Sequence, residues 1–187
     1  MEFYYAPMSC AFASHVLLED AEAIYKATRI DLKKGDQNKP DFLKINPKGR
    51  VPALITSKGI LTETPAIMYY ICMLHPEKKL APNDPYELAG AQAFNMYLSS
   101  TVHVGHAHKH RGQRWTNDEH ALNSLTAQVK NNMTSYAEYI ENNLIKGPWV
   151  LGANYSMCDP YLALVTRWFR DDGVDMRKFP LIIQHNE

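Results

Sequence analysis

The chain has 187 residues, of which 45% are hydrophobic and 21% are charged, as is usual for a globular protein. Its 20 Lys and Arg residues equal its 20 Asp and Glu residues, so the formal net charge is zero. This balance does not indicate a surface for nucleic acid or for an anionic membrane. No apolar stretch approaches the length of a transmembrane helix, and the first residues lack the pattern of a signal peptide. We expect neither a nucleic-acid partner nor a membrane.

The three cysteines, Cys10, Cys72 and Cys158, are odd in number and widely spaced. Such a set does not predict a disulfide framework, and it is typical of a reducing compartment. We therefore expect a cytoplasmic protein.

The N-terminal part alternates between strand-like and helix-like segments. In chain order they are a strand at 2–5, a helix at 10–23, a strand at 25–32, a short helix at 40–45, a strand at 51–56, a strand at 60–62 and a helix at 65–74. Residues 57–59 predict a hairpin turn. Thr64 is a candidate helix cap, with Pro65 at the first helical position. A strand–helix–strand unit followed by a hairpin and a helix predicts a thioredoxin-like α/β domain.

The C-terminal part has only helical patterns. The expected helices are 86 to past 103, 118–144, 157–171 and one from 176 to the chain end. Residues 77–85, rich in Lys, Pro and Asp, predict a linker. We therefore expect two domains: a thioredoxin-like domain at 1–76 and an all-helical domain at 86–187.

Four short motifs now coincide. They are Ser9-Cys10, NPKGRVPAL at 46–54, LTETPAI at 61–67, and WVLG at 149–152 followed by SMCD at 156–159. Together they resemble the glutathione transferase family, most closely its bacterial beta class, over nearly the whole chain. The resemblance implies a thioredoxin-like domain that binds glutathione, followed by an all-helical domain.

The Val51–Pro52 bond is one candidate element of a glutathione site. An X-Pro bond permits the cis form at modest cost, and the resemblance implies that this one is cis. It also implies that the backbone N–H and C=O of Val51 pair with the cysteinyl part of glutathione, as an added strand would. The alternative is that Pro52 only begins a strand.

Glu63 and Thr64 stand at a predicted helix N-terminus, where unpaired N–H groups and the helix dipole favour an anion. The resemblance implies that the γ-glutamyl carboxylate of glutathione binds there, with Glu63 near the adjacent amino group and Lys34 as a further contact. The alternative is a capped helix without a ligand. The S-x-x-D pattern from Ser156 to Asp159 predicts a capping box with no chemistry.

Cys10 is the leading candidate for catalysis, because a helix N-terminus lowers the pKa of a thiol. Ala13 stands where a dithiol redox protein would have its second cysteine, so any resolving thiol must come from outside, for example from glutathione. Cys10 therefore either binds and ionises glutathione or attacks as the nucleophile itself, and the third possibility is an inert core cysteine. Ser9 is the second candidate and Tyr5 the third.

A group of histidines follows in the helical part, where His103, His106 and His110 share a helix face. The resemblance implies that His103 helps to bind or deprotonate the thiol, with Ser99, Ser100 and His106 as further possible contacts. We expect no metal, because no Cys, Asp or Glu joins these histidines in register. Trp115 and Arg114 are weaker candidates for lining a second-substrate pocket.

The resemblance implies a bacterial homodimer that conjugates glutathione to small electrophilic, mostly apolar substrates in detoxification. Glutathione is then a co-substrate. Two alternatives stay open: a glutathione-dependent thiol–disulfide oxidoreductase or peroxidase that uses Cys10, and a non-catalytic glutathione-binding protein. The identity of the second substrate cannot be read from these residues. Members of the family usually continue for a further stretch of helix beyond Glu187.

Overall fold

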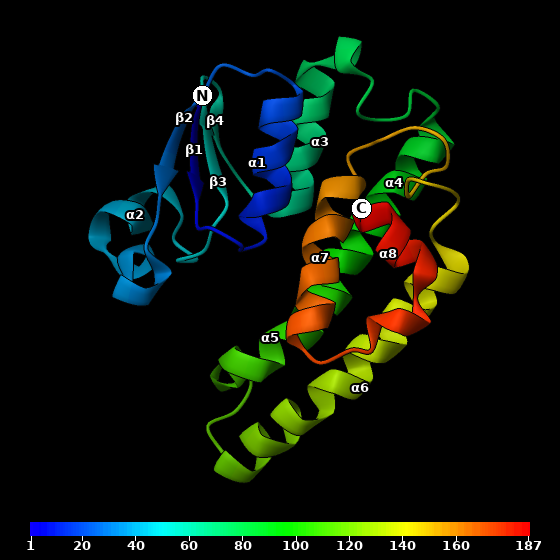
Figure 1. The fold of residues 1–187 in the computed structure, drawn as a ribbon. Coiled ribbons are helices and arrows are strands. Elements are labelled where there is room, and N and C mark those ends of the chain that lie inside the picture. The colour runs from blue at the N-terminus through cyan, green and yellow to red at the C-terminus, as the bar shows by residue number, and fades with distance from the viewer. The chain divides into compact units, whose positions relative to one another are not determined.

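The computed structural model describes residues 1–187, which form two compact units, Met1–Gln92 and Ala93–Glu187 (Figure 1). The division falls inside helix α4 (Pro85–Tyr97). The predicted linker at 77–85 lies earlier in the chain and begins within a short 3-10 turn, η3 (Pro76–Lys78). The domain limits at 76 and 86 therefore remain a prediction.

The first unit contains a four-stranded sheet in the order β2-β1-β3-β4. Its elements are β1 (Glu2–Tyr5), α1 (Ala11–Asp20), β2 (Lys26–Arg29), η1 (Leu32–Lys34), η2 (Asp36–Asn38), α2 (Pro40–Ile45), β3 (Ala53–Thr56), β4 (Gly59–Thr62) and α3 (Thr64–Leu74). β1 runs parallel to β2 and antiparallel to β3, and β3 pairs antiparallel with β4. The predicted thioredoxin-like arrangement is confirmed.

The side chains of β1 alternate between the two faces of the sheet and contact a helix on each face. Phe3 and Tyr5 point to one face, where both rings lie against His15 of α1, with centroids 5.5 and 4.6 Å away. Tyr4 points to the other face, 5.8 Å from Phe42 of α2. α1 and α3 pack side by side on the first face (Figure 1). The loop that joins β1 to α1 therefore ends beside the start of α3.

The second unit is helical. It contains the end of α4, the π-helical turn η4 (Leu98–Val102), α5 (His103–Arg111), η5 (Gly112–Arg114), α6 (Glu119–Asn143), α7 (Asp159–Asp171), η6 (Met176–Lys178) and α8 (Pro180–Asn186). α6 buries Val129, Met133, Ala137 and Ile140, a spacing that forms one helix face. α5 approaches α6 closely at Gly105, where a Cβ would lie 2.7 Å from a ring carbon of Tyr136. No helix of the structure combines the length and the apolar character that crossing a bilayer requires.

The predicted helix from 86 to past 103 is wrong in one respect, because η4 interrupts it. The hydroxyls of Ser99 and Ser100 both donate to the carbonyl oxygen of Met96, at 3.1 and 2.7 Å. These bonds compete with backbone N–H groups for the same acceptor and loosen the regular helix. The spacing of apolar residues in the sequence does not predict this competition.

Two predicted helix starts also need correction. Thr64 is not the cap of α3: Glu63 occupies that position, and Thr64 is already the first helical residue. The last helix does not begin at 176, because η6 ends at Lys178 and α8 begins only at Pro180. The ring of Pro180 keeps the residue before it out of the helical region and so separates the two elements.

Candidate functional site

Cys10 stands at the N-terminal cap of α1, half-buried. Its Sγ lies 3.5 Å from the carbonyl oxygen of Val51, and its own carbonyl oxygen accepts a hydrogen bond of 3.3 Å from Thr64 Oγ1. Cys10 therefore contacts the residue before the Val51–Pro52 bond through its thiol and the first residue of α3 through its backbone. A thiol at a helix N-terminus is placed where the helix dipole stabilises the thiolate.

The Val51–Pro52 bond is cis, as predicted. The turn before it is organised by the buried side chain of Asn46, which donates to the carbonyl oxygen of Arg50 at 2.6 Å and accepts from the backbone N–H of Lys48 at 3.2 Å. Gly49 has a φ of 60°, and a Cβ there would lie 3.0 Å from Asn38 Oδ1. The chain thus requires glycine at this turn, and the turn places Val51 beside Cys10.

The start of α3 is unusual in its backbone. Glu63 has a φ of 72° and a ψ of 123°, values that a non-glycine residue rarely adopts. Its exposed carboxylate pairs with the ammonium of Lys48, which also donates to Thr62 Oγ1 at 2.8 Å. Thr64 is buried, and its carbonyl oxygen lies 3.5 Å from the hydroxyl of Ser14 in α1. These contacts join the N-termini of α1 and α3.

Ser9 is tied to the start of α1. Its hydroxyl donates to the carbonyl oxygen of Ala6 at 2.8 Å and accepts from the N–H of Ala11 at 3.3 Å. Lys34 lies on η1, exposed, with its ammonium 3.9 Å from a carboxylate oxygen of Asp31. The first unit therefore gathers most of the predicted site residues at one place; these are Ser9, Cys10, Val51, Pro52, Glu63 and Thr64. Lys34 makes no hydrogen bond to this group.

The remaining predicted residues lie on the second unit. Ser99 and Ser100 sit on η4, and their hydroxyls bond back to Met96. His103 is the first residue of α5, with its ring 4.8 Å from that of Trp168 on α7. His106 stacks on the same indole at 4.7 Å with an interplanar angle of 2°.

Asp172 holds His106 from the end of α7. The Asp172 side chain is fully buried, and its Oδ2 lies 2.7 Å from Nδ1 of His106. Its other carboxylate oxygen lies 3.2 Å from Nζ of Lys109. A buried carboxylate needs such partners, because leaving water is costly for an unpaired charge. One ring nitrogen of His106 is therefore already engaged within the helical unit.

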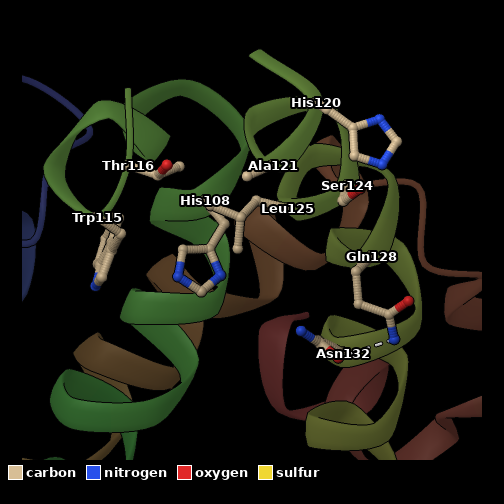
Figure 2. A pocket seen from close by; sticks show the side chains of 9 residues that line it. All are labelled: His108, Trp115, Thr116, His120, Ala121, Ser124, Leu125, Gln128 and Asn132. Atoms are coloured by element: carbon tan, nitrogen blue, oxygen red, sulfur yellow. Dashed lines mark hydrogen bonds between the residues drawn. The ribbon is translucent and has the colours of Figure 1, made fainter. Parts of the chain in front are cut away.

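A hollow of about 740 Å³ lies on the second unit, between the end of α5 and the first half of α6 (Figure 2). Trp115, half-exposed, stands on one side of it with its ring 4.5 Å from that of His108, and Gln128 and Asn132 stand on the other side. Trp115 thus lines a hollow, whereas Arg114 is not among the lining residues. A role of Trp115 towards a second substrate remains a prediction.

The histidines do not form a metal-binding group. No three His, Cys, Asp or Glu side chains come together in a way that could hold an ion. His106 faces Asp172, and His108 faces Trp115 on the side of the hollow.

Comparison with known proteins agrees with these motifs. Residues 1–72 match the family profile described as "Glutathione S-transferase, N-terminal domain". The chain is 30% identical to "Glutathione S-transferase GstA" of Escherichia coli O157:H7 over 171 residues, which is 90% of this chain and 82% of that protein. The chain belongs to the glutathione S-transferase family. The resemblance stated from the sequence motifs is confirmed.

Solved glutathione S-transferases share the whole fold. A glutathione transferase homologue from Sulfitobacter, solved with bound glutathione, is 40% identical with a TM-score of 0.96, and the match covers 99% of this chain and 89% of that one. The bacterial beta class glutathione S-transferase of Sphingomonas chungbukensis is 28% identical with a TM-score of 0.79, covering 100% and 90%.

Three residues to which the sequence analysis assigned no role shape these arrangements. Asn46 orders the turn before Val51, Asp172 holds His106, and Arg111 reaches His103 with a guanidinium nitrogen 3.4 Å from Nε2. Arg111 could have been found, since it follows His103 by a little more than two helical turns and a long side chain points back towards the helix N-terminus. Asp172 could not, because it is 66 residues from His106 in sequence.

Proposed function

We propose that this glutathione S-transferase binds glutathione on its Met1–Gln92 unit and conjugates it, through its thiolate sulfur, to small electrophilic, mostly apolar substrates. The observation that carries the proposal is the convergence of Cys10, Val51 and Thr64, each hydrogen-bonded to another of the three. A tripeptide thiol such as glutathione can use a thiol-facing group, an extended backbone edge and an anion-binding helix start together.

Each part of the ligand has a matching group. The γ-glutamyl carboxylate binds at the N-terminus of α3, where Thr64 and the helix dipole lie, and Glu63 accepts from the amino group. The cysteinyl backbone pairs with Val51. Lys34, exposed on η1, supplies positive charge to a glutathione carboxylate. The sulfur then lies near Cys10, with Ser9 as the second candidate to stabilise its charge.

The family resemblance further supports a role of His103 in binding or deprotonating the glutathione thiol, with Ser99, Ser100 and His106 as further candidate contacts. Among the histidines we favour His103, because the family motif aligns with the sequence around it; each of the two histidines has one ring nitrogen in contact with a neighbour, Arg111 for His103 and Asp172 for His106. We further propose membership of the beta class, a homodimer, a bacterial and cytoplasmic origin, and a role in detoxification. The likeness to the beta-class structure supports the class, and the odd number and wide spacing of the three cysteines support the compartment.

Calorimetric titration with glutathione tests the binding half of the proposal. Thr64→Val keeps the shape of the side chain and removes the hydroxyl, so we expect about tenfold weaker binding. Thr64→Ser keeps the hydroxyl and is the matched control, with affinity close to that of the wild type. Absence of heat with the wild-type protein would refute the glutathione site.

Conjugation of glutathione to an activated aryl chloride tests the catalytic half. We expect turnover by the wild type and retained turnover by Cys10→Ser, because the attacking sulfur belongs to glutathione. Binding without turnover on any of several aryl and alkyl electrophiles would point to the non-catalytic alternative.

Disulfide exchange is the second candidate function, favoured by the position of the Cys10 thiol at the α1 N-terminus. In this reaction the Cys10 thiolate attacks the glutathione sulfur of a mixed disulfide, and the other thiolate leaves and takes a proton. A second glutathione thiolate then attacks the Cys10–glutathione bond, which regenerates Cys10 and yields glutathione disulfide. Cys10→Ser must abolish this reaction, whereas it must spare conjugation.

A further inference from the structure

The carboxylate of Glu63, at the cap of α3, is paired with an ammonium of the protein itself. Nζ of Lys48 contacts Glu63 Oε1 and also donates to Thr62 Oγ1 at 2.8 Å. Water reaches both members of the ion pair, because 47% of the Lys48 side chain and 68% of the Glu63 side chain are exposed. The pair therefore lies on the surface of the first unit, where a solute can contact it.

Both members of the pair are anchored through their backbones. The N–H of Lys48 donates to Asn46 Oδ1 at 3.2 Å, in the turn in which Gly49 has a φ of 60°. Glu63 has a φ of 72°, and its carbonyl oxygen accepts from the N–H of Ile67 at 3.0 Å. The two side chains, in contrast, meet in water, where an ion pair contributes little free energy. Lys48 can therefore leave Glu63 at small cost without any change in the backbone.

The ammonium of Lys48 has the same chemistry as the amino end of a γ-glutamyl group. Each is a compact cation with three N–H donors, and each suits a carboxylate oxygen. A carboxylate that already holds one ammonium attracts a second cation less, because the two like charges repel one another at this distance. The same ammonium offsets the negative charge of Glu63, which otherwise repels an anion that approaches the positive N-terminal end of α3.

We propose that Lys48 sets the preference of this site for the amino group of its ligand, by occupying the place of that group on Glu63. The inference rests on the proposed function, in which Glu63 accepts from the amino group of glutathione. Glutathione must displace Lys48 or share the carboxylate with it, so Lys48 lowers the affinity for glutathione. A tripeptide thiol that lacks the α-amino group leaves the ion pair intact, and its own carboxylate is then not repelled by Glu63. Lys48 thus makes the site tolerant of ligands without an amino group.

Calorimetric titration of the full-length protein with two ligands tests this assignment. The ligands are glutathione and the analogue in which a hydrogen replaces its α-amino group. In Lys48→Met we expect glutathione to bind about threefold more tightly and the analogue to bind about threefold more weakly. A role of Lys48 in the structure of the turn alone would change both affinities in the same direction. Lys48→Arg keeps the charge and should keep the wild-type ratio of the two affinities.

Two controls isolate the ion pair. Lys26→Met removes another exposed ammonium of the first unit, 3.0 Å from a carboxylate oxygen of Glu2, and should change neither affinity. Glu63→Gln removes the carboxylate for which Lys48 and the ligand compete. In the Glu63→Gln background, Lys48→Met should therefore no longer change the two affinities in opposite directions.

The titrations separate this inference from the function on which it rests. Weaker binding of glutathione by Lys48→Met, or unchanged binding of both ligands, would overturn the inference. Opposite changes that persist in the Glu63→Gln background would also overturn it, because Lys48 would then act on the ligand without Glu63. If the wild type bound neither ligand, the proposed function and the inference would fail together, whereas binding by the wild type without the opposite changes would refute the inference alone.

Discussion

Nε2 of His185, in the last helix, lies 2.9 Å from Oδ1 of Asp159 at the start of α7, and both side chains are almost completely buried. The same carboxylate accepts from the N–H of Val150 at 2.8 Å, and from the N–H and hydroxyl of Ser156 at 2.6 and 2.9 Å. Asp159 therefore joins the loop before α7, the first turn of α7 and α8. Of the predicted capping box, the bonds from Ser156 to the Asp159 carboxylate are present, whereas the Ser156 hydroxyl accepts from the N–H of Cys158 at 3.3 Å and Cys158 is the cap of α7. Val150 and His185 are two further partners that the local sequence does not indicate.

Replacing Asp159 by Ala should destabilise the protein by about 3–5 kcal/mol, because several buried donors lose their acceptor at once. Asp171→Ala is the matched control at the other end of α7. Its carboxylate is exposed and lies 3.8 Å from Arg167, so its loss should hardly change the free energy of unfolding. Urea unfolding followed by circular dichroism measures both. Equal losses in the two variants would contradict the central role of Asp159.

The Asp172 cluster gives a second stability prediction. Asp172→Ala leaves His106 and Lys109 without their buried partner and should cost about 3–5 kcal/mol. Lys109→Met should cost less, because His106 still accompanies the carboxylate and the lysine side chain is 30% exposed. Chemical unfolding of the two variants gives the ranking. A larger loss in Lys109→Met would show that the ammonium, and not the carboxylate, organises the cluster.

Thiol reactivity should separate the three cysteines. Burial raises the pKa of the Cys72 thiol to about 12, so only about 10⁻⁴ of it is thiolate at pH 8. Cys158 is completely buried, whereas Cys10 is half-buried at the start of α1. We expect iodoacetamide to add a single group to the native protein at pH 8, counted by mass spectrometry.

Two controls accompany the alkylation. Cys10→Ser should take up none under native conditions, and the denatured wild type should take up three, one for each cysteine. Modification of Cys72 in the native protein at the same rate as Cys10 would mean that α3 opens readily at this pH.

The elements that sequence patterns predicted well are those set by local chemistry. Alternation along residues 2–5, the turn before Gly59 and the contact between Ser156 and Asp159 each depend on neighbours within a few residues. The cis bond at Val51–Pro52 followed from a family motif. Such features can be read locally, because the residues that determine them adjoin in sequence.

The features that escaped prediction depend on partners that the local pattern does not include. η4 arises because two hydroxyls compete for the carbonyl oxygen of Met96. Glu63, and not Thr64, is the cap of α3, and the hydroxyl of Thr64 bonds to the carbonyl oxygen of Cys10, 54 residues away. Of the candidate site, the cluster around Cys10 could be proposed from motifs, whereas the contacts around Asp172 required the packing of α5 on α7.

Tyr97 gives a prediction for alkaline pH. Burial, reinforced by the nearby phenols of Tyr136 and Tyr139, raises the pKa of Tyr97 to about 12 from its ordinary value of 10.0. Because ionisation is easier in the unfolded chain, the stabilisation is complete below pH 10 and is lost as the pH rises towards 12. The phenyl ring of Tyr97→Phe cannot ionise, so the free energy of unfolding of this variant should fall less steeply with pH over this interval.

Tyr86→Phe is the control, because the side chain of Tyr86 is 88% exposed, and it should keep the wild-type dependence of the free energy of unfolding on pH. Urea unfolding at a series of pH values measures this dependence. If the free energy of unfolding of Tyr97→Phe fell as steeply as that of the wild type, the loss of stability at alkaline pH would belong to other groups. Tyr25 is one such group, because burial also raises its pKa.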